Sequence, residues 1–408
     1  MIRYTCSSCG KSFESEAIVY RCESCGGDDA AGYQKGNLMV ELDKSKVGGD
    51  LKPGSPINPF DLLPGGFPLA ECHKLFPVGN TPVLPLGGLE KEGAPKIFGK
   101  LDNLNPSGSL KDRASLFVAA QAKYYGSDKV VLASTGNAGS AMSCAGAALG
   151  LDIVLFVPAA APLEKLAQSL FYGARVIPVD GTYDDAFGLS IEYSLDQGGI
   201  NRNTAYNPLT IEGKKTAALE IYNQFAGKIP DVIYVPVGDG VILTGLFKGF
   251  EDLLSLGLIE KMPRCIAVQA KGSNSIARSL KEGREIPLES SATLADSISV
   301  SSPACGSLAL DYLKKTGSWA VELSDEEILI AQAELARKTG VFVEPSSATT
   351  WGALKKDMEA GHISSDETAL LLLTGSGFKD MSAVKGQIEI PKALPPRLGP
   401  VIDFLSKA

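Results

Sequence analysis

Histidine is almost absent from the sequence. His73 and His362 are the only two among 408 residues. Histidine is the usual base of serine-nucleophile triads and a frequent ligand of catalytic metals. A histidine-centred triad and a histidine-rich catalytic metal site are therefore nearly excluded, and any chemistry here needs another base.

Long apolar runs and an excess of positive charge are also absent. No run of about 18 apolar residues occurs, and the start, MIRYTCSSCGKSF, lacks the basic-then-apolar pattern of a signal peptide. There are 39 Lys and Arg against 47 Asp and Glu, a net charge of −8, and such a surface repels phosphate backbones. We therefore expect a cytoplasmic protein with no membrane partner and no nucleic-acid partner.

What is present is the composition of an ordinary globular protein. Hydrophobic residues make up 44% and charged residues 21%. At about 150 residues per domain, 408 residues predict two or three domains. The eight cysteines, in a reducing compartment, are expected to be metal ligands or buried small side chains rather than disulfides.

Two Cys-x-x-Cys pairs stand near the start of the chain, in CSSCG and CESCGG, with twelve residues between them. This spacing is typical of a zinc ribbon, in which four thiolates close a tetrahedron around one ion. Four protein ligands leave no open position, so the zinc is expected to be structural, in a ribbon over residues 1–35. A nucleic-acid-reading ribbon is disfavoured because its basic residues are few and scattered. The predicted ligands are Cys6, Cys9, Cys22 and Cys25.

From about residue 95 the chain alternates between two kinds of segment. Short apolar, β-branched runs alternate with longer segments of helical character, which is typical of parallel sheets covered by helices on both faces. The segment 324–340 predicts a helix with a capping box, because Ser324 lies three positions before Glu327 and Gly340 ends the segment. Residues 36–75 predict a linker with loops and a short helix. The predicted strands are 129–134, 152–158, 174–180, 231–238, 264–270 and 368–375.

Four turns have unusual residue types, and strand-to-helix turns at the carboxyl edge of a parallel sheet are where such folds bind ligands. In NPSGSLKDR, Lys111 begins a helix, where the positive end of the helix dipole disfavours a cation. A lysine whose pKa is lowered can act as an amine nucleophile. The alternative, a solvated lysine paired with Asp112, is about equally favoured by this pattern alone.

The next two turns suit anions. ASTGNAGSA, at 133–141, places small residues and an asparagine at a helix start, which exposes N–H donors to a carboxylate or phosphate. A plain helix cap is an equally favoured interpretation. VPVGDGVILTG, at 235–245, matches neither a Walker P-loop nor a dinucleotide fingerprint, which leaves a phosphate cradle of backbone N–H groups. Asp239 within it is expected to point away from the phosphate.

The fourth turn, LLLLTGSGFKD at 370–380, brings the Thr374 hydroxyl to the end of a buried strand. A hydroxyl there can hydrogen-bond the nitrogen of a heterocycle without charging it. A lysine amine, a carboxylate-binding helix start, a phosphate cradle and a hydroxyl together fit pyridoxal phosphate.

In this order, the four motifs and FVEPSSA at 342–348 resemble those of the fold-type-II pyridoxal-phosphate enzymes. With the zinc-ribbon head and GNTPVLPL at 79–86, the sequence is most similar to the threonine synthase family over nearly the whole chain. The resemblance implies a tryptophan synthase β-like α/β fold, with two α/β domains of parallel-rich sheets and the small ribbon. A homodimer is compatible with it, because members of this fold type are often dimers.

The resemblance also implies an arrangement of domains. The larger domain, which would bind the phosphate of the cofactor, comprises 76–101 and 213–408. The smaller domain, 102–212, would carry the lysine, and the cofactor would lie in the cleft between the two.

Roles for individual residues follow from the same resemblance. Lys111 would bind the cofactor covalently and then move protons, Asn137 would hydrogen-bond the cofactor's 3-oxygen, and Thr374 would face its pyridine nitrogen. The residues that would hold the substrate's α-carboxylate are Ser134, Thr135 and Gly136. The N–H groups for the cofactor's 5′-phosphate would come from Gly238, Asp239, Gly240, Val241 and Ile242.

The implied reaction converts O-phospho-L-homoserine and water into L-threonine and phosphate, so the substrate is a small amino acid and the enzyme a carbon–oxygen lyase. Two departures from the family's pattern bear on the substrate. Ser376 stands where a histidine is common, and Thr210 stands where an arginine usually binds the substrate's phosphate. Lys214 and Lys215 are the candidates to replace that arginine.

Two other functions stay open on the sequence alone. Without a pocket for a second phosphate, the protein would be a pyridoxal-phosphate-dependent serine or threonine ammonia-lyase, or a β-replacement enzyme. If Lys111 never meets a cofactor, the protein would be a non-enzymatic zinc-ribbon scaffold or binding protein.

Overall fold

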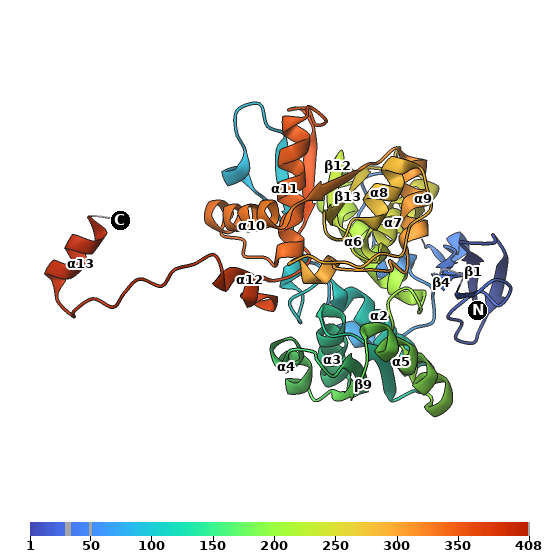
Figure 1. The fold of residues 1–408 in the computed structure, drawn as a ribbon. Helices are drawn as coiled ribbons and strands as arrows, with labels where there is room; N and C mark the ends of the chain where they lie inside the picture. Colours follow the sequence, from blue (N-terminus) through green and yellow to red (C-terminus); the bar gives the residue numbers. More distant parts are fainter. Residues whose placement is uncertain (29–33, 49–50, 407–408) are drawn as a thin grey trace.

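The computed structural model describes residues 1–28, 34–48 and 51–406 (Figure 1). A small sheet at the start of the chain lies beside two bodies, each built on a parallel-rich sheet. At the other end, an extended segment leads past α12 (Met381–Lys385) to α13 (Leu398–Leu405), which projects away from the rest of the molecule.

The larger sheet has six strands in the order β14-β13-β12-β15-β7-β6. All neighbouring pairs are parallel except β6 and β7, which are antiparallel. Along β12, Ile233 and Val235 pack into the core on one face, and Val232 and Tyr234 into the core on the other. Both faces are buried, which explains why these strands are apolar throughout. The strands are β6 (Val83–Pro85), β7 (Lys96–Lys100), β12 (Val232–Pro236), β13 (Arg264–Ala270), β14 (Ala320–Leu323) and β15 (Thr368–Leu372).

Helices cover both faces of this sheet. Four of them contribute to the core with Ile233 and Val235: α6 (Leu209–Gln224), α7 (Val241–Ser255), α8 (Ser275–Glu282) and α9 (Gly306–Thr316). On the opposite face lie α10 (Asp325–Thr339) and α11 (Pro345–Glu359).

The smaller sheet has four parallel strands in the order β10-β9-β8-β11. Val130 and Leu132 of β8 pack toward α2 and α3, while Val131 and Ala133 pack toward α5. Again both faces are covered. The elements are α2 (Lys111–Tyr124), β8 (Lys129–Ala133), α3 (Asn137–Leu149), β9 (Asp152–Pro158), α4 (Leu163–Phe171), β10 (Arg175–Val179), α5 (Tyr183–Gln197) and β11 (Ile200–Asn201).

These observations confirm the predicted α/β class with parallel-rich sheets. The six predicted strands form within the predicted ranges, and the helix predicted over 324–340 is α10. Its capping box is present, because the Ser324 side chain accepts from the Glu327 N–H and the Glu327 carboxylate accepts from the Ser324 N–H. Gly340 ends it in the left-handed conformation, at φ +73°.

The head sheet extends past the predicted boundary at residue 35. Its strands are β2 (Ser12–Ser15), β1 (Ile2–Cys6) and β5 (Leu38–Val40), and a separate pair joins β3 (Gly27–Asp28) to β4 (Gln34–Lys35). Tyr4 and Leu38 share one core with residues of α2 and α3. A sheet this small cannot bury enough surface alone, so it packs on the smaller body. The short helix predicted within 36–75 is α1 (Leu69–Leu75). The boundaries proposed for the two α/β domains stay predictions.

A search of the described residues for membrane-crossing helices finds none: each helix there is too short or too polar to span a bilayer.

Candidate active site

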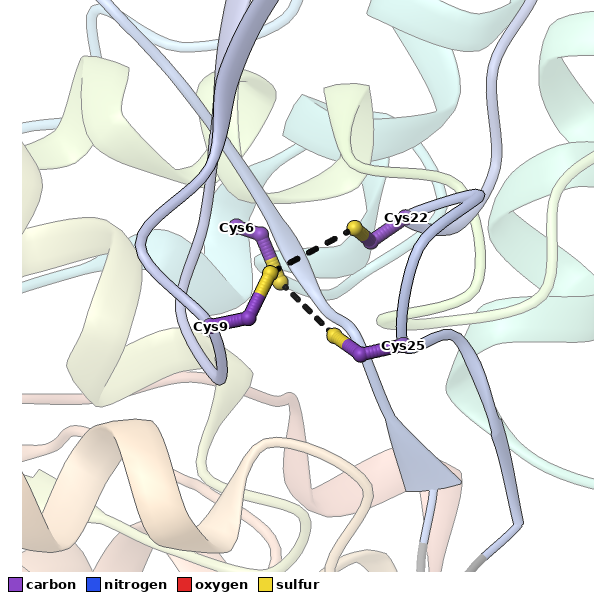
Figure 2. Close-up of side chains that lie close together, drawn as sticks. All are labelled: Cys6, Cys9, Cys22 and Cys25. Atoms are coloured by element: carbon purple, nitrogen blue, oxygen red, sulfur yellow. Dashed lines mark hydrogen bonds between the residues drawn. The ribbon is translucent and has the colours of Figure 1, made fainter.

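The four cysteines of the head converge on one point (Figure 2). The Sγ atoms of Cys6 and Cys25 are 3.4 Å apart and those of Cys9 and Cys22 are 3.8 Å apart. All four sulfurs lie within 4.8 Å of one another. Zn–S bonds of about 2.3 Å in a tetrahedron place sulfurs about 3.8 Å apart. The donor set therefore fits the predicted zinc ion.

Lys111 is half-buried at the first position of α2. The turn before it is fixed by two hydrogen bonds: the Leu110 N–H donates to the Thr374 carbonyl at 2.8 Å, and the Ser107 N–H donates to the Asp112 carboxylate at 2.7 Å. Burial raises the pKa of Asp112 to about 7. Among the ion pairs of the described residues, none joins Asp112 to Lys111. The alternative of a solvated lysine paired with Asp112 is thus not supported.

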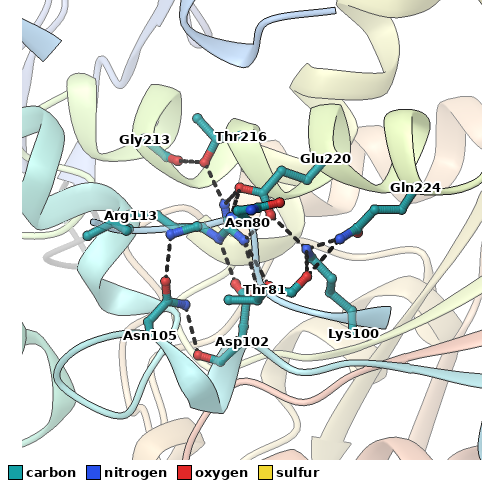
Figure 3. A network of polar contacts seen from close by, with 12 residues as sticks. Asn80, Thr81, Lys100, Asp102, Asn105, Arg113, Gly213, Thr216, Glu220 and Gln224 are labelled. Atoms are coloured by element: carbon teal, nitrogen blue, oxygen red, sulfur yellow. Dashed lines mark hydrogen bonds and ion pairs between the residues drawn. The ribbon is translucent and has the colours of Figure 1, made fainter. Parts of the chain in front are cut away.

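A buried network holds the first turn of α2 in place (Figure 3). Arg113 donates bidentately to Asp102, with Nε–Oδ2 2.6 Å and Nη2–Oδ1 2.9 Å, and to Glu220, at 2.7 and 2.8 Å. Lys100 donates to Glu220 at 2.6 Å and to the Thr81 carbonyl at 2.7 Å. Two cations face two carboxylates, so the buried cluster is neutral. The backbone two residues from Lys111 is therefore anchored to three other segments.

An acid titration should reveal this network. Burial alone would raise the pKa of Glu220, but Arg113 and Lys100 lower it from 4.5 to about 2. A carboxyl group with a lowered folded-state pKa stabilises the protein above its unfolded pKa, and this contribution is lost as pH falls from 4.5 towards about 2. The free energy of unfolding by urea should therefore fall less steeply below pH 4.5 in Glu220→Gln than in wild type. Equal slopes would contradict the paired carboxylate.

A cavity of about 600 Å³ lies between the two bodies. Its walls come from the turn before Lys111, the loop that begins α3, and the start of α11, with Lys379 from the segment after β15. Lys379 donates to Ser140 at 2.8 Å and to Gln168. Lining residues include Ser107, Thr135, Gly136, Asn137, Glu344 and Ser346. Thr135, Gly136 and Asn137, which the sequence predicted as ligand-binding, thus line one cavity, and Ser134 directly precedes them.

Asn137 has a partner that the sequence did not predict. Its Nδ2 donates to both oxygens of the Glu344 carboxylate, at 3.2 and 2.9 Å, and to the Ser297 hydroxyl at 3.1 Å. Burial raises the pKa of Glu344. Gly375 passes so close that a Cβ there would lie 2.4 Å from this carboxylate. Glu344 therefore fixes the orientation of the Asn137 amide inside the cavity.

The glycine-rich turn at the start of α7 differs in one respect from the prediction. Gly240 adopts φ +85°, and a Cβ on it would lie 2.9 Å from the Cys305 carbonyl oxygen, so only glycine fits. The Asp239 carboxylate does not turn away from the loop: it accepts from the Val241 N–H at 3.0 Å. The Val241 N–H, expected to bind phosphate, is thus already satisfied. Gly238 precedes this turn and Ile242 lies in the first turn of α7, and their predicted phosphate contacts stay predictions.

Thr374 lies beyond the end of β15, buried and close to Lys111 in the fold. Its hydroxyl shares a 2.9 Å hydrogen bond with Ser347, which accepts from the Gly375 N–H at 2.8 Å. The pair presents a neutral hydroxyl beside the turn that carries Lys111.

The two candidate lysines of α6 have opposite surroundings. Lys215 is buried in an ion-pair cluster, 2.5 Å from Glu212 and 2.9 Å from Asp252, and donates to the Leu62 carbonyl. Its charge is thus already neutralised by two carboxylates, and its predicted contact with the substrate stays a prediction. Lys214 is fully buried, and no described residue accepts a hydrogen bond from its Nζ.

The donor set fits pyridoxal phosphate. An amine begins α2, a neutral hydroxyl follows β15, an oriented amide lies in the cavity and the turn at the start of α7 offers N–H groups beside the helix dipole. Comparison with known proteins agrees with this: the family model described as "Pyridoxal-phosphate dependent enzyme" matches residues 75–375.

Solved structures share this fold. The fungal L-serine ammonia-lyase from Rhizomucor miehei superposes with a TM-score of 0.65 at 23% identity, over 76% of this chain and 97% of that chain. The threonine deaminase of T.th. does so with a TM-score of 0.63 at 25% identity, over 76% and 96%. At these identities the first comparison establishes the fold alone.

Curated relatives are more similar in sequence. The threonine synthase of Methanosarcina acetivorans is 33% identical over 401 residues, which cover 96% of this chain and 95% of the relative. That of Methanocaldococcus jannaschii is 34% identical over 392 residues, covering 95% of each chain. The chain therefore belongs to the pyridoxal-phosphate-dependent enzymes and, among them, to the threonine synthase family.

Proposed function

We propose that this protein is a pyridoxal-phosphate-dependent lyase that converts O-phospho-L-homoserine and water into L-threonine and phosphate. The observation that carries the proposal is the match to threonine synthases over about the full length of both chains. The cleft supports it, because the predicted carboxylate-binding loop and the oriented Asn137 amide line one cavity with the turn that precedes Lys111.

Different residues of the cleft have different roles in the proposed reaction. When bound, pyridoxal phosphate supplies an electron sink for the charge that develops beside the substrate nitrogen. Lys111 would hold the cofactor, and its amine would move protons at Cα and Cβ of the substrate. The Ser134–Gly136 loop binds the α-carboxylate at the N-terminal end of α3, where the dipole favours an anion.

Asn137, Thr374 and one turn would orient the cofactor. The Asn137 amide, which Glu344 fixes, would contact the 3-oxygen, and the Thr374 hydroxyl would hydrogen-bond the pyridine nitrogen. N–H groups of the turn at Gly238–Ile242 would receive the 5′-phosphate, with the exception of the Val241 N–H that Asp239 occupies. A neutral hydroxyl as its partner would leave the pyridine nitrogen uncharged.

The cysteines and the cavity indicate the cellular compartment and the size of the substrate. We infer a cytoplasmic enzyme, because all eight cysteines are free thiols, four of them arranged for a metal ion that requires reduced ligands. Its partner is a small amino acid, for which the cavity of about 600 Å³ has room beside the cofactor.

The decisive assay compares two products. Wild-type enzyme loaded with pyridoxal phosphate should release inorganic phosphate from O-phospho-L-homoserine and form threonine at the same rate. An ammonia-lyase, which the fold would also support, would instead release ammonia from serine or threonine. Ammonia release without phosphate release would overturn the proposal.

The head offers a separate prediction. Cys22→Ser should release zinc and unfold the head locally, because a sheet of this size depends on its metal, while cofactor binding by the main body is retained. Zinc content by atomic emission and cofactor absorbance would be measured on the same sample. Cys144→Ser, outside the cluster, should retain zinc. Loss of the cofactor together with zinc at unchanged folded population would contradict a purely structural head.

A further inference from the structure

Arg202 and Lys214 are buried cations that lack sufficient partners. Their exposed fractions are 1% and 0%. Arg202 Nη1 donates to the Thr204 hydroxyl at 2.9 Å, but its Nε and Nη2 find no acceptor among the described residues, and neither does Lys214 Nζ. A buried charge is costly unless it is paired and hydrogen-bonded.

Other buried cations of this chain have hydrogen-bond and ion-pair partners. Arg113, as deeply buried, donates to two carboxylates and a threonine hydroxyl. Lys215, next to Lys214 in the sequence, has two carboxylates and a carbonyl as partners. Among the buried lysines and arginines of the described residues, Arg202 and Lys214 are thus the two without a carboxylate partner.

The surroundings of these two cations carry excess positive charge. Burial lowers the pKa of Lys214 and the charge of Lys111 lowers it further, whereas Asp239 opposes this change. Burial also lowers the pKa of Arg202 to about 10, with Asp239 again opposing. The cations Lys111, Arg202 and Lys214 therefore outnumber the carboxylates around them, Asp239 and Asp112. This surplus of positive charge suits a phosphate monoester, which carries about −1.5 to −2 at neutral pH.

We propose that Arg202 and Lys214 form the binding site for the phosphate group of the substrate, replacing the arginine that is absent at Thr210. This inference rests on the proposed function. Lys214 lies four residues after Thr210 on α6, so it occupies the same helix face one turn further along. Arg202 supplies a planar guanidinium whose Nε and Nη2 have no acceptor among the described residues.

The position of Arg202 favours the substrate over the cofactor as the source of the phosphate. Its N–H donates to the Val131 carbonyl of β8, and the Asn203 amide oxygen accepts from the Ala133 N–H at 2.7 Å. Arg202 therefore lies beside the strand that leads into the Ser134–Gly136 loop, where we place the substrate's carboxylate. Carboxylate and phosphate are joined by a chain of three carbons and one oxygen, so neighbouring sites can hold both.

The test separates the two phosphate sources. Arg202→Met and Lys214→Met would be compared with Arg175→Met and Lys123→Met, whose side chains lie at the surface. Apoprotein is titrated with pyridoxal phosphate, and loaded protein with 2-amino-5-phosphonopentanoate and with norvaline, which has the same carbon chain without the phosphonate. Binding is followed by cofactor absorbance.

Both variants should bind the phosphonate about 10- to 100-fold more weakly, the range for losing a charge-assisted contact, and bind norvaline and pyridoxal phosphate within about twofold of wild type. Replacing the unpaired Lys214 ammonium by methionine should also leave the apoprotein's Tm equal or higher, so a fold defect cannot mimic the result. If the variants bound pyridoxal phosphate more weakly but still preferred the phosphonate over norvaline as wild type does, these cations would belong to the cofactor site. That result would overturn the proposal.

Variants that bind pyridoxal phosphate, the phosphonate and norvaline as tightly as wild type would also overturn the proposal that Arg202 and Lys214 bind the substrate's phosphate. The proposed function can fail separately: wild type would then show no preference for the phosphonate over norvaline and release no phosphate from O-phospho-L-homoserine. Wild type that prefers the phosphonate, with variants that keep this preference, would refute only the role of Arg202 and Lys214.

Discussion

Lys111→Ala is expected to lower kcat/KM for phosphate release by about 5 kcal/mol or more in transition-state free energy, close to 10⁴-fold. The loss is this large because one amine both holds the cofactor and moves the protons, and the near absence of histidine leaves no obvious substitute base. Borohydride reduction followed by peptide mapping should find no cofactor attached to the variant.

Lys123→Ala is the matched control, because Lys123 lies exposed in the last turn of the same helix. It should retain full activity and a reducible cofactor adduct at Lys111. Activity of Lys111→Ala above a hundredth of wild type would contradict the assignment, whereas restored turnover with added alkylamines would support it.

Arg113→Met should destabilise the protein by about 3–5 kcal/mol, because Asp102 and Glu220 would be left buried without their common partner. Equilibrium urea unfolding of the apoprotein measures this directly. The same substitution should weaken cofactor attachment, since the first turn of α2 would lose its anchor.

Arg175→Met provides the comparison for the loss of an ion pair. Arg175 pairs with Asp152 on the surface, where the side chains are 55% and 40% exposed, and such pairs contribute little. Near-equal destabilisation by the two substitutions would contradict the importance of the buried network.

The fold could be predicted because its signals are local. The six predicted strands each carry an apolar run, and the Ser324 capping box and Gly340 mark both ends of α10. The pairing of β5 (Leu38–Val40) with β1 was not predicted, because three residues are too few for a periodic pattern.

The cleft was predicted where the sequence has special turns and missed where contacts are made at long range. The turns that hold Lys111, Asn137 and Thr374 have unusual local composition. Glu344 lay within a motif that resembled the family's, but its contact with Asn137 spans 207 positions of sequence. Arg202 follows a strand of two residues, β11, which leaves no periodicity to detect.

The two lysines of α6 show a further limit. Lys214 and Lys215 are the same residue type at adjacent positions, yet their side chains leave the helix in different directions. Lys215 reaches Asp252 of α7, and Lys214 packs against Gly245 on the side of Asp239. Which of the two is neutralised depends on the packing of α6 against α7, and nothing in the local pattern reports it.

The network around Arg113 also determines which part of the cleft can stay still. It joins Asp102 and Arg113, on one side of the predicted domain boundary, to Lys100 and Glu220 on the other. A rotation of one body against the other can leave these four ions together only if its axis passes through them. Points near an axis sweep short arcs, and the backbone of the first turn of α2, which carries Lys111, is anchored there. During any such closure this turn would move little, while the Ser134 and Gly238 loops would move farther.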